Sequence, residues 1–99
     1  MTAEAEQKAE SAEIREWLAE WLVRRGMLGR PLPNDFAEAN FFQRCWVDSF
    51  GVVELIEETE RRFGLTFAPS ELDDANFGVV GRFVELVQQA KARSRGTPR

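Results

Sequence analysis

The residues with the clearest chemical potential lie at Asp48 and Ser49, where an acidic and periodic segment begins. A helix that starts here directs backbone N–H groups and the positive end of its dipole toward Ser49, and both favour an anion. A phosphate ester on this serine is therefore electrostatically favourable. The serine is a weak nucleophile on its own, because no histidine or lysine lies nearby in the sequence to take its proton. The position suits a serine that another enzyme modifies.

Composition excludes most catalytic chemistry. The chain of 99 residues has no histidine and a single cysteine, which removes Ser-His-Asp and Cys-His catalysis, internal disulfides and multi-cysteine metal sites. Cys45 has no neighbouring group to activate it, and we expect it to be partly buried in apolar surroundings. We therefore expect no enzymatic activity, no catalytic residue and no metal ligand.

Helices must position this serine, because apolar residues recur at helical spacing on both sides of it. The first such stripe predicts a helix over residues 11–25 that ends at Gly26. A long loop, residues 27–47, follows, and Trp46 is expected to pack it against the next helix. The loop is expected to lie over the bundle through five apolar anchors. These anchors are Leu28, Leu32, Phe36, Phe41 and Phe42.

The second helix is predicted to begin at Asp48 or Ser49 and to end at Phe63, with Gly64 as its stop. A short helix follows, with Ser70 and Asp73 in capping-box spacing. The last helix is predicted over about residues 79–92, with Asn76 as its cap. The fold class is therefore all-α, a small four-helix bundle with a long first loop and a short third helix. We expect a flexible segment at residues 1–10, a folded domain at 11–91 and a basic flexible tail at 92–99.

The second helix has two contrasting faces when its residues are placed at 100° intervals. One face is predicted to be buried and consists of Val52, Leu55, Ile56, Thr59 and Phe63. Phe50 and Val53 point away from that face, among the carboxylates of Glu54 and Glu57. Exposed apolar residues ringed by acids predict a docking face for a basic partner. The alternative is that the long loop folds over Phe50 and Val53.

Charge and hydropathy limit the partners. The net charge is −4, and residues 48–74 contain eight acids against two arginines, so nucleic acid would be repelled. Residues 91–99 carry four basic residues and no acid, and we expect them to be a solvated end rather than a contact for nucleic acid or membrane. The sequence lacks an apolar run long enough to span a membrane and the layout of a signal peptide. We expect a cytoplasmic monomer.

The segment VDSFGVVELIEETERRFGLTF, residues 47–67, resembles the phosphopantetheine-attachment region of acyl and peptidyl carrier proteins. Residues 48–50 match the family's Asp-Ser-Leu, residues 53–55 its apolar-acidic-apolar step, and residues 60–64 its Glu-x-x-Phe-Gly. The later segment SELDDANFGVVGRFVELV is similar to the third and fourth helices of the family. The resemblance covers roughly residues 11–91.

The resemblance implies a carrier protein. Ser49 would receive 4′-phosphopantetheine from coenzyme A, and the thiol of that arm would hold an acyl or aminoacyl group as a thioester. Asp48 would help to position the serine during transfer, while Phe50, Val53, Glu54 and Glu57 would face partner enzymes. The implied partners are a phosphopantetheinyl transferase, an acyl- or aminoacyl-loading ligase, and downstream transferases or synthases. Mg²⁺ would belong to the transferase reaction.

Several positions depart from the pattern of fatty-acid-synthesis carriers. Cys45-Trp46 stands where Leu-Gly is usual, Gly51 replaces an acid, Glu57 replaces an apolar residue and Thr59 replaces a core leucine. The segment DSFGVVEL is closer to the free-standing carriers of specialised pathways, such as those for D-alanyl or glyceryl groups. The alternative function is an unmodified helical interaction module with an acidic docking helix, in which Ser49 is only a cap.

Overall fold

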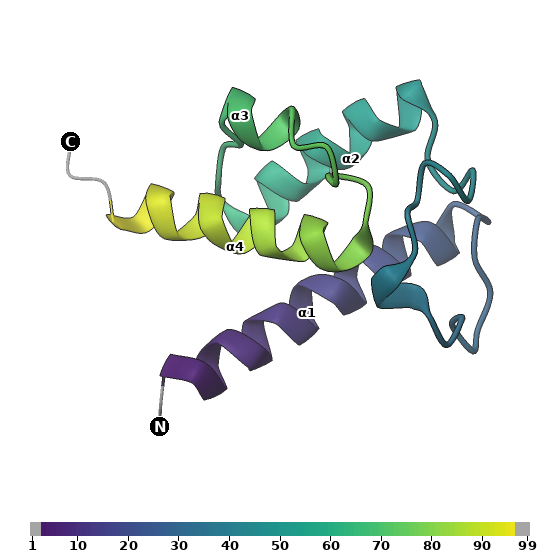
Figure 1. Cartoon of the computed structure of the whole chain (residues 1–99), viewed down its shortest axis with the longest axis horizontal. Helices are drawn as coiled ribbons and strands as arrows, with labels where there is room; N and C mark the ends of the chain where they lie inside the picture. Colours follow the sequence, from purple (N-terminus) through teal and green to yellow (C-terminus); the bar gives the residue numbers. More distant parts are fainter. Residues whose placement is uncertain (1–2, 97–99) are drawn as a thin grey trace.

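Four α-helices surround one core in the computed structural model, which describes the backbone of residues 3–96 and the side chains of residues 3–94. In chain order the elements are α1 (Ala3–Arg24), the 3-10 turn η1 (Phe36–Glu38), α2 (Ser49–Phe63), α3 (Pro69–Leu72) and α4 (Val80–Gly96). Figure 1 shows the long loop at the end of the molecule where α1 stops and α2 starts. The described residues contain no β-strand, only an isolated bridge between Asn40 and Val79. The predicted all-α fold is confirmed.

Helix α1 begins at Ala3, so the predicted start at Ser11 is wrong. Residues 3–10 are rich in alanine, glutamate, glutamine and lysine, which favour helix without forming an apolar stripe. Two contacts also tie this part of α1 to α4. The Gln88 side chain donates to the Gln7 carbonyl at 3.0 Å, and the Lys91 ammonium lies 2.7 Å from the Glu10 carboxylate. Met1 and Thr2 lie outside the described residues.

Helix α4 extends to Gly96, beyond the predicted end near Ala92. The reason is a tertiary contact in its last turns, where the Arg93 guanidinium donates to the Glu71 carboxylate at 2.6 and 2.9 Å. Helix α4 begins at Val80, so the predicted cap at Asn76 is wrong. Residues 97–99 of the predicted basic tail lie outside the described residues. No helix in the described part of the chain is both long and apolar enough to cross a membrane.

Aromatic rings fill the centre of the core. The Phe83 ring lies 5.8 Å from Phe41, 6.2 Å from Phe67 and 5.5 Å from Phe77, measured between centroids. Burial of each such side chain contributes about 1.5–3 kcal/mol. Thr59 is fully buried as well, and its hydroxyl donates to the Leu55 carbonyl at 2.6 Å. The threonine therefore places no unsatisfied polar group in the core.

The long loop lies over the core, as predicted, and it also packs against the start of α4. Phe36 and Phe41 are buried, and Leu28 and Leu32 are partly buried against the core. Phe42 is 40% exposed, although its ring lies 4.9 Å from that of the buried Phe41, so it anchors the loop only in part. Trp46 is partly buried against the core and its ring lies 5.9 Å from that of Phe36. The loop therefore ends in a fixed position beside α2.

Gly78 is the residue that permits this close approach. The Phe41 N–H donates to the Gly78 carbonyl at 2.8 Å, and the Val80 N–H donates to the Ala39 carbonyl at 2.9 Å. A Cβ atom on Gly78 would lie 2.5 Å from the Phe42 ring and 2.7 Å from the Asn40 side-chain oxygen. Any larger residue at position 78 would therefore push the loop away from α4.

Helix α3 starts one residue earlier than the predicted cap, so the predicted capping box of Ser70 and Asp73 is wrong. Pro69 occupies the first helical position, and the Glu71 carboxylate accepts a hydrogen bond from the Ala68 N–H at 2.7 Å. Proline suits this position because its fixed φ matches the helix and no N–H is required there. Glu71, only 7% exposed, thus has a structural role.

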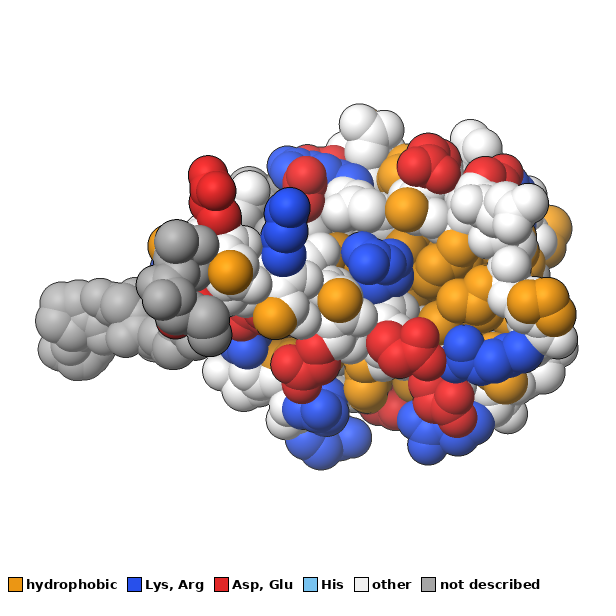
Figure 2. Space-filling view, turned by 90° about the horizontal axis from the view of Figure 1, so that it is seen from below, with side chains coloured by type: hydrophobic (Ala, Val, Ile, Leu, Met, Phe, Trp, Pro, Cys, Tyr) orange, Lys and Arg blue, Asp and Glu red, His pale blue; other side chains and the backbone are white. Residues whose placement is uncertain are grey.

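Ion pairs cross the surface of α1. Arg30 reaches from the loop to Glu16 and Glu20, with nitrogen–oxygen distances of 2.6 and 3.3 Å. Both glutamates raise the pKa of Arg30, chiefly through hydrogen bonds from its guanidinium. Figure 2 shows basic and acidic side chains intermixed around an apolar area on one face of the molecule. Water screens such exposed pairs, so their effect on stability is small.

Candidate functional site

Ser49 is the first residue of α2, and its side chain is exposed. Asp48 is the N-cap: its backbone is extended, and its Oδ1 accepts a hydrogen bond from the Gly51 N–H at 2.7 Å. The predicted start and end of α2 are both confirmed, since Gly64 closes the helix in the left-handed conformation at φ 67°. The serine thus lies where the first backbone N–H groups of a helix have no intrahelical acceptor.

The loop before Ser49 fixes the start of α2. The N–H groups of Trp46 and Val47 both donate to the Phe41 carbonyl, at 2.9 and 3.1 Å. Val47 is buried, and Gly51 lies against it: a Cβ atom on Gly51 would be 3.5 Å from Val47 and 3.2 Å from the Asp48 carboxylate. A glycine at this position leaves space for the Asp48 carboxylate to accept the hydrogen bond from the Gly51 N–H.

Cys45 is exposed, so the prediction that it is partly buried is wrong. Its φ is 61°, in the left-handed region that few non-glycine residues adopt. This turn directs the next two residues inward and leaves the thiol outside, where its sulfur lies 4.0 Å from the Gln43 carbonyl. Sequence reasoning missed the exposure because it depends on the backbone conformation of a single residue.

The two faces of α2 are as predicted. Leu55 and Thr59 are fully buried, and Val52, Ile56 and Phe63 pack partly buried against the core. Phe50 is 85% exposed and Val53 is 52% exposed. The long loop therefore does not cover them, and the alternative in which it does is wrong. An aromatic ring and a valine stand in solvent beside the serine.

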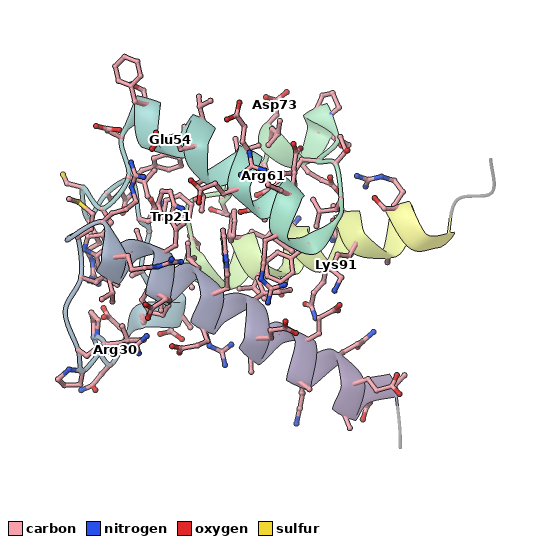
Figure 3. All side chains as sticks on the ribbon, turned by 180° about the vertical axis from the view of Figure 1, so that it is seen from behind. Trp21, Arg30, Glu54, Arg61, Asp73 and Lys91 are labelled. Atoms are coloured by element: carbon pink, nitrogen blue, oxygen red, sulfur yellow. The ribbon has the colours of Figure 1, made fainter. Side chains whose placement is uncertain are left out.

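The acids of α2 differ in how they are engaged. Glu54 lies 2.5 Å from the Arg25 guanidinium, Glu58 accepts a hydrogen bond from the Trp21 indole at 3.0 Å, and Glu60 accepts one from the Phe67 N–H at 3.0 Å. Figure 3 shows Trp21 between α1 and α2, on the side where Glu54 lies. Glu57 is exposed and makes no hydrogen bond or ion pair with any described residue. Its charge is therefore available to a partner.

Arg25 is a residue of the site that sequence reasoning missed. Its guanidinium lies 4.4 Å from the centre of the Trp21 ring, a cation–π arrangement, while also pairing with Glu54. Trp21 lies in the last turn of α1 and Arg25 directly follows the helix, four residues on, so their spacing alone could have suggested the stacking. The link to Glu54 required the tertiary structure.

The site can accept a modification more readily than it can catalyse one. The Ser49 hydroxyl has no hydrogen-bond partner among the described residues, so neither a base nor an acceptor activates it. The described residues also contain no cluster of acidic or cysteine side chains arranged to hold a metal ion. What the site offers is an exposed hydroxyl at the positive end of a 15-residue helix, which fits a phosphate ester.

Comparison with protein families gave a matching family model. A family model described as a phosphopantetheine attachment site matches residues 25–87. The matched range is well over half of the chain and contains the long loop, α2, α3 and the first part of α4. Comparisons with curated proteins and with solved structures gave no match.

Proposed function

Because the chain belongs to the phosphopantetheine attachment-site family, and so is a carrier domain for this prosthetic group, we propose that Ser49 is the residue that bears it. One observation supports this choice above the others. The matched range contains two serines, Ser49 and Ser70. Ser49 starts a long helix with its hydroxyl exposed, whereas Ser70 lies within α3, which has only four residues. A helix that short has a weak dipole to stabilise a phosphate ester.

The residues around Ser49 would each contribute to loading. The hydroxyl has no partner among the described residues, so a transferase can deprotonate it and join its oxygen to the phosphorus next to pantetheine in coenzyme A. The P–O bond of the diphosphate bridge breaks, and adenosine 3′,5′-bisphosphate leaves. Asp48 holds the first turn of α2 closed through the Gly51 N–H. The helix N-terminus then stabilises the charge of the phosphodiester. When bound, the group supplies a thiol on a flexible arm that can hold a cargo as a thioester.

We further propose that the chain delivers an acyl or aminoacyl group to partner enzymes, and that these bind the exposed face of α2. Phe50 and Val53 would enter an apolar socket, and Glu57 would meet a basic residue at its rim. Glu54, also predicted to face partners, is held by Arg25 and would have to exchange that pair for a new one. Glu57 is thus the acid of this face whose interaction with a partner costs no internal contact.

The departures from the fatty-acid carrier pattern support a cargo of a specialised pathway. A Cβ atom on Gly51 would lie 3.2 Å from the Asp48 carboxylate, so the acid of that pattern would be crowded against Asp48. Thr59 is satisfied internally by the Leu55 carbonyl and lies in an aromatic core. A small cargo held in solvent on the arm is consistent with these features.

Intact mass measurement tests the assignment of Ser49. The chain is incubated with coenzyme A, Mg²⁺ and a broad-specificity phosphopantetheinyl transferase, alongside Ser49→Ala and the matched control Ser70→Ala. We expect the wild type and Ser70→Ala to gain one phosphopantetheine, and Ser49→Ala to gain none. If folded wild type gains nothing with several transferases, the unmodified interaction module becomes the better explanation.

Loading kinetics test the docking face. Glu57→Gln should lower kcat/KM for the transferase by about two- to fivefold, corresponding to about 0.5–1 kcal/mol for an exposed charge pair. The matched control is Glu38→Gln, because Glu38 is also exposed but lies in η1, away from α2. Equal losses in both variants would mean that only net charge matters and that α2 is not the docking face.

A further inference from the structure

A surface hollow of about 310 Å³ lies beside Ser49, between the end of α1, the long loop and the start of α2. Its walls include Trp21, Arg25, Met27, Cys45, Trp46 and Asp48. We propose that this hollow is the resting seat of the phosphopantetheine arm, which folds back from Ser49 along α1 and the loop. The proposal rests on the proposed modification of Ser49.

Position is the first argument. Asp48 and Gly51 both line the hollow, and Ser49 belongs to the same first turn of α2. Ser49 does not itself line the hollow, but it directly follows Asp48, so a group attached to Ser49 starts next to the hollow and has to turn back to enter it. None of Phe50, Val53 and Glu57 lines it. An arm seated here leaves the docking face of α2 uncovered, so a partner can bind while the arm is at rest.

The second argument is chemical complementarity. The arm consists of a phosphodiester followed by a thin chain of methylene and amide groups that ends in a thiol. Among the described residues that line the hollow, Arg25 is the one cation and Asp48 the one acid. Arg25 also pairs with Glu54, so its guanidinium would interact with the phosphodiester through its remaining N–H groups. The indoles of Trp21 and Trp46 and the thioether of Met27 provide apolar walls for the chain. Small-molecule sites occupy about 300–1,000 Å³, and this hollow, at the lower end, suits a narrow group.

The walls are held in place before any arm is attached. The Trp21 indole donates to Glu58, and the Arg25 guanidinium stacks on the Trp21 ring. On the opposite side, the backbone N–H of Trp46 donates to the Phe41 carbonyl, and the Trp46 ring packs on Phe36. A preformed seat binds its occupant with little loss of side-chain entropy.

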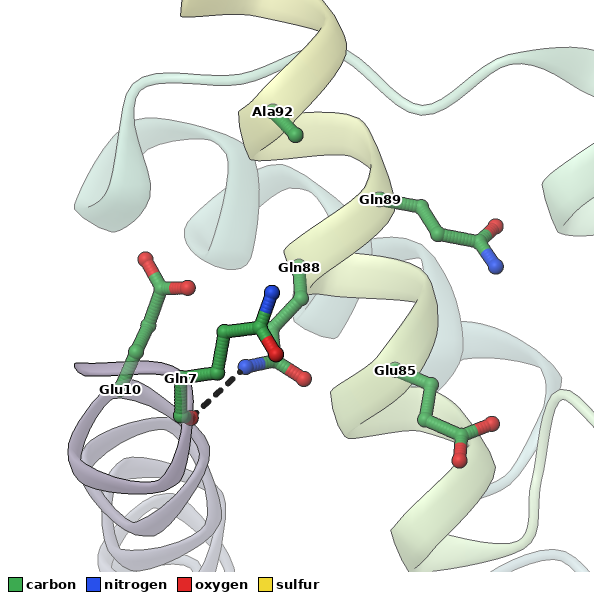
Figure 4. A pocket seen from close by; sticks show the side chains of 6 residues that line it. All are labelled: Gln7, Glu10, Glu85, Gln88, Gln89 and Ala92. Atoms are coloured by element: carbon green, nitrogen blue, oxygen red, sulfur yellow. Dashed lines mark hydrogen bonds between the residues drawn. The ribbon is translucent and has the colours of Figure 1, made fainter. Parts of the chain in front are cut away.

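Another hollow of similar volume, about 310 Å³, lies between the N-terminal half of α1 and α4 and makes a useful comparison. Figure 4 shows its walls, which are long polar side chains such as Gln7, Glu10 and Gln88. It contains no aromatic residue and no residue of α2. Size alone therefore does not select the seat; the proximity to Ser49 and the aromatic walls do.

The experiment first establishes loading by intact mass and then compares ¹H–¹⁵N spectra of the unloaded and loaded protein. We expect loading to shift the indole N–H signals of Trp21 and Trp46 and the backbone signal of Met27. The indole of Trp17, which packs on Phe63 with ring centres 5.5 Å apart, serves as an internal control and should not move. Shifts confined to the residues next to Ser49, or shifts that extend to α3 instead, would overturn the proposal.

A matched pair of variants separates the seat from general surface effects. Met27 and Leu72 are 45% and 39% exposed, so Met27→Glu and Leu72→Glu should both keep the fold. The new carboxylate at position 27 should replace an apolar wall by a charged one and so disfavour the methylene chain of the arm, so that Met27→Glu gains the full mass but loses the shifts at Trp21 and Trp46. Leu72→Glu should keep them. Retention of the shifts in Met27→Glu would contradict the seat, whereas absence of the mass gain in wild type would instead contradict the modification itself.

Alkylation of Cys45 gives an independent readout. The exposed thiol should react with iodoacetamide severalfold more slowly in the loaded protein, because the arm covers it. Digestion and mass measurement distinguish this thiol from that of the arm. Ser49→Ala, treated with the transferase in the same way, should show no slowing. An unchanged rate at Cys45 in the loaded protein would overturn the proposal.

Discussion

At the scale of single residues, Asp48 determines where α2 begins. Its carboxylate accepts the Gly51 N–H at 2.7 Å. Asp48→Ala should therefore lower the free energy of unfolding by about 0.5–2 kcal/mol, the usual effect of losing an N-cap. Asp48→Asn should keep most of the stability, because an amide oxygen can also cap. Urea denaturation followed by circular dichroism checks both variants.

The same pair of variants separates two roles of Asp48, the capping of α2 and the effect of its charge on loading. If the carboxylate also acts toward the transferase, Asp48→Asn should fold normally but load slowly. Equal destabilisation by alanine and asparagine would show that the cap geometry does not support the helix as described.

Residue patterns predicted which side chains of α2 are exposed, but they did not predict the ion pairs that these side chains make. Helical angles placed Glu54 and Glu57 outside the core, and both lie there. Only the structure shows that, among the described residues, Glu54 is paired and Glu57 is not, because the partner of Glu54 is Arg25, which follows the end of α1. Cys45 shows the same limit for burial, since a single left-handed φ turns its thiol outward.

At the scale of elements, α3 depends on α4. A helix of four residues is unstable alone, and α3 is held by Glu71, whose carboxylate accepts two hydrogen bonds from Arg93. Arg93 is the main cause that lowers the pKa of Glu71 below its usual value; the hydrogen bond from Ala68 also lowers it, while burial opposes the change. Because the pKa is lower in the folded state, this stabilisation is present at neutral pH and is lost as pH falls through the folded-state pKa.

Arg93→Gln should therefore unfold at a lower urea concentration than wild type at pH 7, and the difference should shrink in acid as Glu71 becomes protonated. Arg24→Gln is a suitable control. Arg24 pairs with Glu20 at 3.8 Å, with both side chains largely in water, so its loss should have little effect. Equal urea midpoints for wild type and Arg93→Gln at pH 7 would contradict the role of this contact.

Element boundaries were predictable where the chain carries explicit caps. Asp48 and Gly64 bound α2 at the residues expected from their types. The start of α1 and the end of α4 were missed because both are polar, and their helical state is supported by contacts such as that of Gln88 with Gln7. In α3 the cap is the side chain of Glu71, which acts on Ala68 rather than through Ser70.

At the scale of the whole molecule, the apolar stripes of the sequence were sufficient to predict α1, α2 and α4 around one core, whereas the short α3 was predicted from a cap that the structure does not show. The spacing of residues 48–64 was sufficient to predict the family, whose model matches residues 25–87. The hollow beside Ser49 could not be predicted in this way, because its walls come from three segments that the fold brings together. The need for glycine at position 78 could not be predicted either, because it arises from Asn40 and Phe42 of the long loop, which pack against Gly78.

The exposure of Phe50 also has a consequence for the colloidal behaviour of the protein. The isoelectric point is about 4.9, and the net charge at neutral pH is −4, so copies repel one another in neutral buffer. Near the isoelectric point this repulsion vanishes, and a ring that is 85% exposed can contact the same ring of another copy. Light scattering should therefore rise as pH is lowered toward 5, and Phe50→Ser should suppress that rise. Equal scattering from both proteins would show that the ring plays no part. The exposure of Phe50 that we propose to serve docking would thus also promote self-association of the isolated protein in mild acid.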